Sequence, residues 1–503
     1  MNETKVEAVA ESINYRKLIT KSSIYMLGVL ISKAVGFVMI PIYTRYLIPA
    51  DYGVMELLAM TTNVVSMLIG IGLAAAVLRF YYDYDSEKDQ NEVVSTALSV
   101  SLVLFGTVFG LLALNSSHAS QLVFSTDEYT HHFRVIFVTM MLSAGIEIPM
   151  IYLRAMQRAG SFVTISMVRL VIQLSLNIIA VVALGLGVLG ILYSSLISSI
   201  VVGGYLVVTT FAKTGISISL PKLKVMARYG YPMVFSSIGA FILTFSSRYF
   251  LNYYSSLDEV GIFALGFSFG IMVSFLVNLP FGQFWGAEMF VVAKRKDGPE
   301  TISTVLTYKI LISVLFCLGM SLFIKEVIEF IADEAYWRAW EFVPVICAAY
   351  VVAGMREHTN CGILITKQTK YGAYAAGIGV VVMIVLCFQL IPRYGAMGAA
   401  VATLVAGWVR FQLLHWYSQR LFRVNYDWGR ILTAIGLAAT LVVASYWVKG
   451  DLVAVLAIKS AMYLFFLFVL FWSGWIRPRE REIIIKAVRN PRAVLNSFRT
   501  VGQ

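Results

Sequence analysis

Six charged side chains within or beside long apolar stretches have the clearest capacity for chemistry in this sequence: Lys33, Glu147, Arg248, Lys309, Arg356 and Glu357. A charge at the centre of a bilayer costs about 3 kcal/mol on insertion scales, so it normally faces water, a ligand or a partner. Lysine and arginine bind phosphate groups, and the planar guanidinium does so through two parallel hydrogen bonds. We therefore expect the four basic residues and Glu357 to line a substrate cavity.

Some of these charges also have a purely structural interpretation. Arg356 and Glu357 are neighbours and can neutralise each other. Arg248 lies near the end of its expected span, which weakens its assignment to the cavity. Five other arginines lie near expected helix ends, where long side chains reach the headgroups: Arg45, Arg79, Arg154, Arg158 and Arg169.

Glu147 is a candidate for ion coupling because it precedes Pro149 by two residues. Proline removes a backbone donor and distorts the helix, which frees a carbonyl beside a titratable carboxylate. Such a pair could bind the proton or Na⁺ that drives a transporter. The alternative is an ordinary kink in which Glu147 bonds a neighbouring helix.

The sequence contains no pattern typical of catalysis. It has no Walker loop, GxSxG or HExxH motif, and its five histidines lack zinc-site spacing. Its four cysteines lie in or beside apolar segments and form no CxxC pair. We therefore expect a protein that is not an enzyme, with no catalytic residues, metal site or cofactor.

The elements that must position these charges are membrane spans. Of the residues, 59% are hydrophobic and only 14% are charged, which excludes a large soluble enzyme and a disordered chain. Apolar stretches of about 20 residues predict an all-α polytopic membrane protein with about 14 transmembrane helices. The expected spans are 22–46, 54–80, 93–114, 133–153, 162–185, 188–212, 229–251, 260–288, 301–324, 340–365, 371–392, 395–418, 431–448 and 452–476.

The placement of Lys and Arg predicts the orientation. With a cytoplasmic N-terminus, 26 of them fall in inside segments and five in outside loops. This asymmetry predicts that both termini are cytoplasmic. The basic residues behind the net charge of +12 lie between apolar stretches and in the two tails, where they orient a membrane protein, so we expect contact with membrane lipids and no nucleic-acid partner.

An internal repeat divides the chain. The segment 50–57 (ADYGVMEL) aligns with 258–265 (DEVGIFAL), and Gly187 and Gly190 align with Gly395 and Gly398, all at an offset of 208. Because this offset contains six spans, it predicts two parallel six-helix bundles around a central cavity. The expected parts are a cytoplasmic tail (1–21), bundles at 22–212 and 229–421 joined by a basic linker (213–228), an appended helix pair (426–476) and a basic cytoplasmic tail (477–503).

Residues 36–53 contain the pattern G-F-x3-P-x3-R-x-L-x-P-x-D-Y-G. This pattern resembles the opening signature of the polysaccharide (O-antigen type) flippases in the multidrug/oligosaccharidyl-lipid/polysaccharide (MOP) exporter superfamily. Further matches are Arg79-Phe80, the stretch Arg154…Arg158…Phe162 and the turn Gly187-x-x-Gly190. The resemblance covers residues 20–420 and implies two six-helix bundles. The last helix pair is a departure from the family pattern.

The resemblance implies a transporter that flips undecaprenyl-pyrophosphate-linked oligosaccharide repeat units across the bacterial inner membrane, by alternating access, for polysaccharide biosynthesis. It also implies a polysaccharide polymerase and chain-length machinery as candidate partners. One alternative is a multidrug/toxin extrusion antiporter of the same superfamily. Another, from a different class, is a membrane polysaccharide polymerase or glycosyltransferase.

Overall fold

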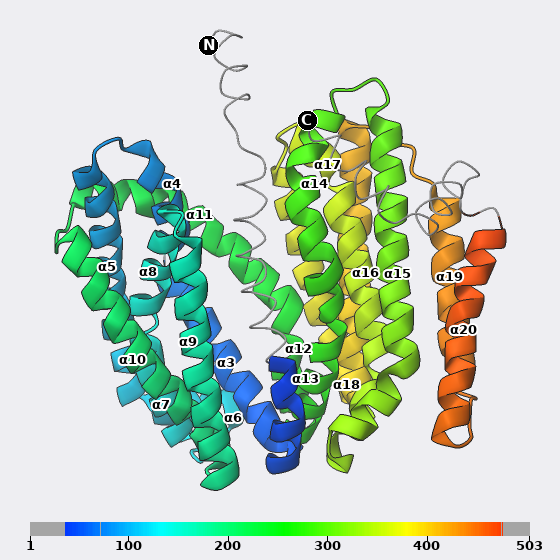
Figure 1. Ribbon diagram of the computed structural model, residues 1–503, viewed down its shortest axis with the longest axis horizontal. Coiled ribbons are helices and arrows are strands. Elements are labelled where there is room, and N and C mark those ends of the chain that lie inside the picture. The colour runs from blue at the N-terminus through cyan, green and yellow to red at the C-terminus, as the bar shows by residue number, and fades with distance from the viewer. Residues whose placement is uncertain (1–35, 71, 474, 476–503) are drawn as a thin grey trace. The chain divides into compact units, whose positions relative to one another are not determined.

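The computed structural model describes residues 36–70, 72–473 and 475, and within this part of the chain the regular secondary structure is helical, without β-strands. Neighbouring helices within each part of the chain run roughly side by side (Figure 1). The chain is therefore an all-α polytopic membrane protein, as the apolar stretches predict.

Residues 36–46 are helical. The helices that follow are α3 (Pro49–Ile69), α4 (Leu73–Phe80), α5 (Glu87–Leu114), α6 (Ser116–Phe124), α7 (Thr130–Met141), α8 (Ala144–Ala155), α9 (Ala159–Ile178), α10 (Gly187–Thr214), α11 (Leu220–Phe245), α12 (Ser247–Tyr254), α13 (Leu257–Gly270), α14 (Leu279–Val292), α15 (Gly298–Ile331), α16 (Val343–Thr359), α17 (Cys361–Ile365), α18 (Lys370–Leu421), α19 (Trp428–Ser445) and α20 (Leu452–Trp472). Short 3₁₀ or π-helical turns occupy Tyr81–Asp83, Ile179–Ala183, Ser274–Asn278 and Glu334–Glu341.

Ten helices in the described part of the chain are long and apolar enough to cross a membrane, and two bent helix pairs bring the number to twelve. One of the ten is α18, whose 52 residues contain two expected spans. A continuous helix of 52 residues would be about 78 Å long, more than twice the thickness of the hydrocarbon core, so α18 cannot be a single span. Gly395, with φ 51°, interrupts it where the sequence predicts a break. Most of the first expected span, including Lys33, lies outside the described residues.

The contacts divide the chain into two compact units. Unit 1 contains the chain up to Leu265 together with Glu329–Ala339 and Ala376–Ala406. Unit 2 contains Gly266–Ile328, Trp340–Ala375 and the chain from Gly407 onward. Each unit thus combines segments that are distant in sequence.

One core cluster of unit 1 contains four packed phenylalanines. Phe105 and Phe109 of α5 pack with Phe133 and Phe137 of α7, and all four are at most 3% exposed. Two spans of this unit are broken beside that core. Gly72, with φ 64°, separates α3 from α4, and Leu142 and Ser143 separate α7 from α8. The second break places Glu147 in the first turn of α8.

The two segments of the sequence repeat begin corresponding helices. Pro49 starts α3 and Leu257 starts α13, 208 positions later. At the second match, Gly187 and Gly395 both have positive φ, 54° and 51°. Only glycine adopts this conformation without a steric penalty. Equivalent positions of the sequence repeat thus start helices in both segments and have a positive φ at both glycines.

In unit 2, the appended helices α19 and α20 lie side by side (Figure 1). Asp427 caps the start of α19 by accepting a hydrogen bond from the backbone N–H of Arg430. On α20, Lys459 is 5% exposed, and its Nζ lies 2.5 Å from a carboxylate oxygen of Glu326 on α15. This buried ion pair holds α20 against α15.

Candidate functional site

The start of α3 packs against the start of α13 with almost no space between the backbones. A Cβ atom at Gly53 would lie 2.2 Å from the carbonyl oxygen of Leu257, and one at Gly261 would lie 1.9 Å from that of Pro49. Adding 208 to 49 and 53 gives 257 and 261, so the two contacts are equivalent under the repeat. This is the reciprocity of two repeats related by a twofold axis. The segment pairs Pro49–Gly53 and Leu257–Gly261 are called the glycine contact below.

Polar contacts within unit 1 join the two repeats around the glycine contact. The guanidinium of Arg248 on α12 lies 3.5 Å from Glu56 on α3 and is fully buried between the rings of Phe245 and Phe263. Three hydrogen bonds also connect the repeats: Tyr336 Oη to Leu47 O (2.9 Å), Asn252 Nδ2 to Val123 O (2.7 Å) and one between the hydroxyls of Thr61 and Tyr249 (3.0 Å). In this conformation Arg248 therefore connects helices and does not face open space.

Unit 2 brings three of the predicted site residues together. Lys309 on α15 is 2% exposed, donates a hydrogen bond to the carbonyl oxygen of Gly354 (2.8 Å), and lies 3.9 Å from Glu357. Its ammonium also lies 4.9 Å from the centre of the Phe281 ring, a distance at which cation and ring attract. Arg356 is 3.8 Å from the other carboxylate oxygen of Glu357.

A further cation completes this group. Arg410, in the second half of α18, lies near enough to Arg356 and Glu357 to interact with their charges. Its buried Nε has no hydrogen-bond partner in the part of the chain that the structure describes. Lys309, Arg356, Arg410 and Glu357, called the basic cluster below, have a net charge of +2. The side chains of Glu357 and Arg356 are 47% and 23% exposed, so the cluster has an open side.

Neighbouring residues fix the backbone that supports the basic cluster. A Cβ atom at Gly354 would lie 2.5 Å from the side-chain oxygen of Asn278, whose amide nitrogen donates to Tyr350 O (3.1 Å). Asn278 ends a π-helical turn, a distortion common at functional sites. His358 follows Glu357 but belongs to the core. It is 1% exposed, stacks on Trp285 and donates a hydrogen bond from Nε2 to Ile302 O.

Glu147 has a different environment, in unit 1. It is exposed and lines a cavity of about 230 Å³ beside Ser66, Gly70 and Gly72 at the break between α3 and α4. Among the described residues that line this cavity, none is a Lys, Arg or His that could pair with its carboxylate. The two helix breaks therefore meet at an open cavity that contains an unpaired carboxylate.

The structure thus assembles Lys309, Arg356 and Glu357 and places Arg248 and Glu147 elsewhere. Sequence reasoning missed Arg410 and Glu56. Arg410 carried a usable signal, because it is the sole Lys, Arg, Asp or Glu between Arg393 and Arg420. Glu56 carried none, because only the packing of α3 against α12 makes it the partner of Arg248.

Comparison with known proteins gives a family and a fold. Residues 18–285, more than half of the chain, match the model of the family described as "Polysaccharide biosynthesis protein". A search of curated proteins returned no match.

Solved structures similar to this one include the lipid II flippase MurJ in an inward closed conformation, with a TM-score of 0.72 and 13% identity over 90% of this chain and 99% of that chain. An inward-facing multidrug resistance MATE family transporter of the MOP superfamily gives 0.61 and 15%, over 80% and 97%. A MOP superfamily transporter from Pyrococcus furiosus, described by the reverse polarity of its binding pocket, gives 0.50 and 15%, over 80% and 94%. These likenesses, at 13–15% identity, show a shared fold.

Proposed function

The chain belongs to the family of polysaccharide biosynthesis proteins, and we propose that it flips undecaprenyl-pyrophosphate-linked oligosaccharide repeat units outward across the bacterial inner membrane. The observation that carries this proposal is the net charge of +2 on the basic cluster, which lies on apolar helices and has an open side. The fold shared with the lipid II flippase MurJ agrees with a lipid-linked substrate.

The chemistry of the basic cluster suits a pyrophosphate. Lys309 uses one of its three N–H donors on Gly354 O, which leaves two for a ligand. Arg356 and Arg410 offer planar pairs of donors that match phosphate oxygens. Glu357 keeps part of the charge paired while the site is empty, and this reduces the free energy needed to hold three cations in apolar surroundings. A bound anion then competes with the Glu357 carboxylate for these cations.

We further propose that the duplicated halves, 22–212 and 229–421, carry out alternating access. The charge distribution predicts that the starts of α3 and α13 lie on the outer side. The glycine contact then closes the outer side, and the helices separate there when the substrate leaves. Arg248 and Glu56 belong to this closure, because their ion pair joins the two halves near the same helix ends.

We propose Glu147 as the residue that couples transport to an ion gradient. The cavity beside it holds no compensating cation among the described residues, so its carboxylate can take up a proton or Na⁺. The cavity is bounded by α3, α4, α5, α8 and α11, which come from both halves. A change in charge at Glu147 can therefore alter the packing of one half against the other.

The rival functions differ in chemistry. The net charge of the basic cluster opposes the cationic compounds that a drug antiporter exports. A polymerase or glycosyltransferase needs acid–base residues that handle an acceptor, and we assign no catalytic residue, metal or cofactor to this chain.

The deciding experiment deletes the gene and locates the lipid-linked repeat units. We expect them to accumulate on the inner leaflet while their synthesis continues. Restoration by the wild-type gene but not by a Lys309→Gln variant of equal abundance would support the proposal. Altered polymer length without accumulation would instead indicate a polymerase, and increased drug sensitivity without accumulation would indicate a drug antiporter.

A further inference from the structure

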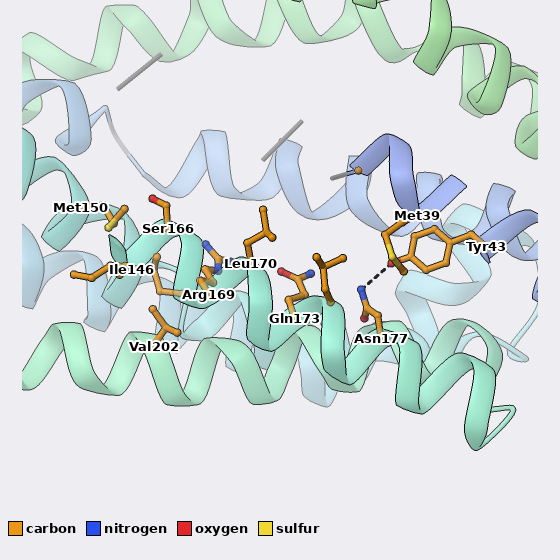
Figure 2. A pocket seen from close by; sticks show the side chains of 13 residues that line it. Met39, Tyr43, Ile146, Met150, Ser166, Arg169, Leu170, Gln173, Asn177 and Val202 are labelled. Carbon is orange, nitrogen blue, oxygen red and sulfur yellow. Dashed lines mark hydrogen bonds between the residues drawn. The ribbon is translucent and has the colours of Figure 1, made fainter. Parts of the chain in front are cut away.

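A second polar cavity lies within unit 1, between α8, α9, α10 and the helical segment 36–46 (Figure 2). Its volume is about 410 Å³. Its apolar lining includes Met39, Met150 and Val202. The polar side chains that line it are Tyr43, Ser166, Arg169, Gln173 and Asn177.

Four of these polar residues lie on one face of α9. Positions 166, 169, 173 and 177 are three or four residues apart, which places them one above another on a helix. Arg169 and Asn177 are separated by eight residues, about 12 Å along the axis. The cavity therefore presents a polar stripe that is longer than a single functional group.

The neutral residues of the stripe are already oriented by hydrogen bonds. Asn177 is 3% exposed, and its amide nitrogen donates to the hydroxyl of Tyr43 at 2.7 Å (Figure 2). Gln173 donates in the same way to Ser195 Oγ at 3.0 Å. The side-chain oxygen of Asn177 is buried and accepts no hydrogen bond from the described residues. A ligand with a hydrogen-bond donor, such as a hydroxyl group, would satisfy this side-chain oxygen of Asn177.

Arg169 supplies the charge of the cavity. Figure 2 shows its guanidinium between Ser166 and Gln173. Among the described residues its buried Nε has no hydrogen-bond partner, and the residues that line the cavity include no Asp or Glu. Such a cation inside a membrane protein is costly unless a ligand compensates it.

The depth of Arg169 limits the source of that ligand. Arg169 is ten residues from the start of α9 at Ala159, about 15 Å along the helix. This is half the thickness of a hydrocarbon core of about 30 Å. The phosphate of a bilayer lipid does not reach this depth, so an anion at Arg169 must enter the cavity from solution or as part of a transported molecule.

We propose that this cavity binds an acidic sugar, with a carboxylate or phosphate substituent at Arg169 and hydroxyl groups at Gln173 and Asn177. A simple inorganic anion would pair with Arg169 but would leave the Asn177 acceptor unused. A neutral sugar would leave the cation uncompensated. The inference rests on the proposed function, and it narrows the substrate to repeat units that contain an acidic sugar.

The test measures binding of sodium glucuronate, glucose and inorganic phosphate to the purified full-length chain by calorimetry. We expect glucuronate to bind most tightly, and Arg169→Gln to weaken it about tenfold to a hundredfold, the range for a lost charge-assisted hydrogen bond. Arg169→Lys retains the charge and should retain part of the affinity. Arg154→Gln is the matched control, since Arg154 is exposed on α8 and does not line the cavity.

Equal affinity for glucose and glucuronate would overturn the inference, as would phosphate binding as tightly as glucuronate. If Arg169→Gln is unstable, the Arg169→Lys variant and the preference of the wild type for glucuronate over glucose still decide the matter. Unchanged flipping of an acidic repeat unit by Arg169→Gln would reject the inference and leave the proposed function standing. Glucuronate binding by a wild-type protein that flips no lipid-linked sugar would reject the proposed function alone.

Discussion

Replacing Gly261 by alanine should open the glycine contact. The new Cβ atom would lie 1.9 Å from Pro49 O, whereas carbon–oxygen contacts between helices need about 3.3 Å. The backbones must therefore separate by about 1.4 Å. Overpacking of this kind costs about 1–3 kcal/mol, which shifts the equilibrium between closed and open outer ends about 5- to 150-fold toward the open form.

Spin labels at Glu128 and Glu334 can measure this shift. Both residues are exposed and belong to unit 1, one in each half. We expect Gly261→Ala to populate longer distances and to slow flipping. Gly53→Ala should do the same more weakly, because its Cβ would lie 2.2 Å from the opposing carbonyl oxygen.

The matched control is Gly106→Ala in α5, because a Cβ atom there has no neighbour within 4 Å. It should leave both the distances and flipping unchanged. Wild-type distances and wild-type flipping in a folded Gly261→Ala protein would refute the assignment of the glycine contact as the outer closure.

Three other changes test separate parts of the structure. Lys309→Gln should reduce flipping about tenfold or more, since it removes a cation from the basic cluster, while Lys309→Arg should retain most of the rate; equal rates for wild type and Lys309→Gln would contradict this. Glu147→Gln should abolish the dependence of transport on a proton or Na⁺ gradient, and unchanged ion dependence would end that hypothesis. Lys459→Met should destabilise the purified protein by about 3–5 kcal/mol in thermal denaturation, because Glu326 is left buried and unpaired. The double change with Glu326→Leu should recover most of this loss, and additive losses would argue against a buried pair.

The spans could be predicted from sequence because a bilayer imposes both a length and an apolar composition on each helix. Within the described residues, every expected span from 54–80 onward is mainly helical, including the two that α18 contains. The breaks between α3 and α4 and between α7 and α8 were not predicted. Hydropathy averages over a window and does not register the interruption of a few hydrogen bonds.

The candidate site was predictable only in part. Lys309, Arg356 and Glu357 stood out because charges are rare in apolar segments, and the structure brings them together. The sequence predicts that Arg169 lies near a helix end, whereas it lies ten residues into α9 and lines a cavity. The direction in which a charged side chain points depends on which helices pack beside it. The pattern of apolar and charged residues along the chain does not show which helices those are.

The central claim is that the chain moves lipid-linked oligosaccharide between leaflets. Its most direct test reconstitutes the purified protein in proteoliposomes with an undecaprenyl-pyrophosphate-linked oligosaccharide and measures how much sugar becomes accessible to an added glycosidase on the opposite face. We expect more sugar to become accessible than in protein-free vesicles, and less of it when Lys309→Gln replaces the wild type. Equal accessibility with and without the protein, under an imposed ion gradient, would contradict it.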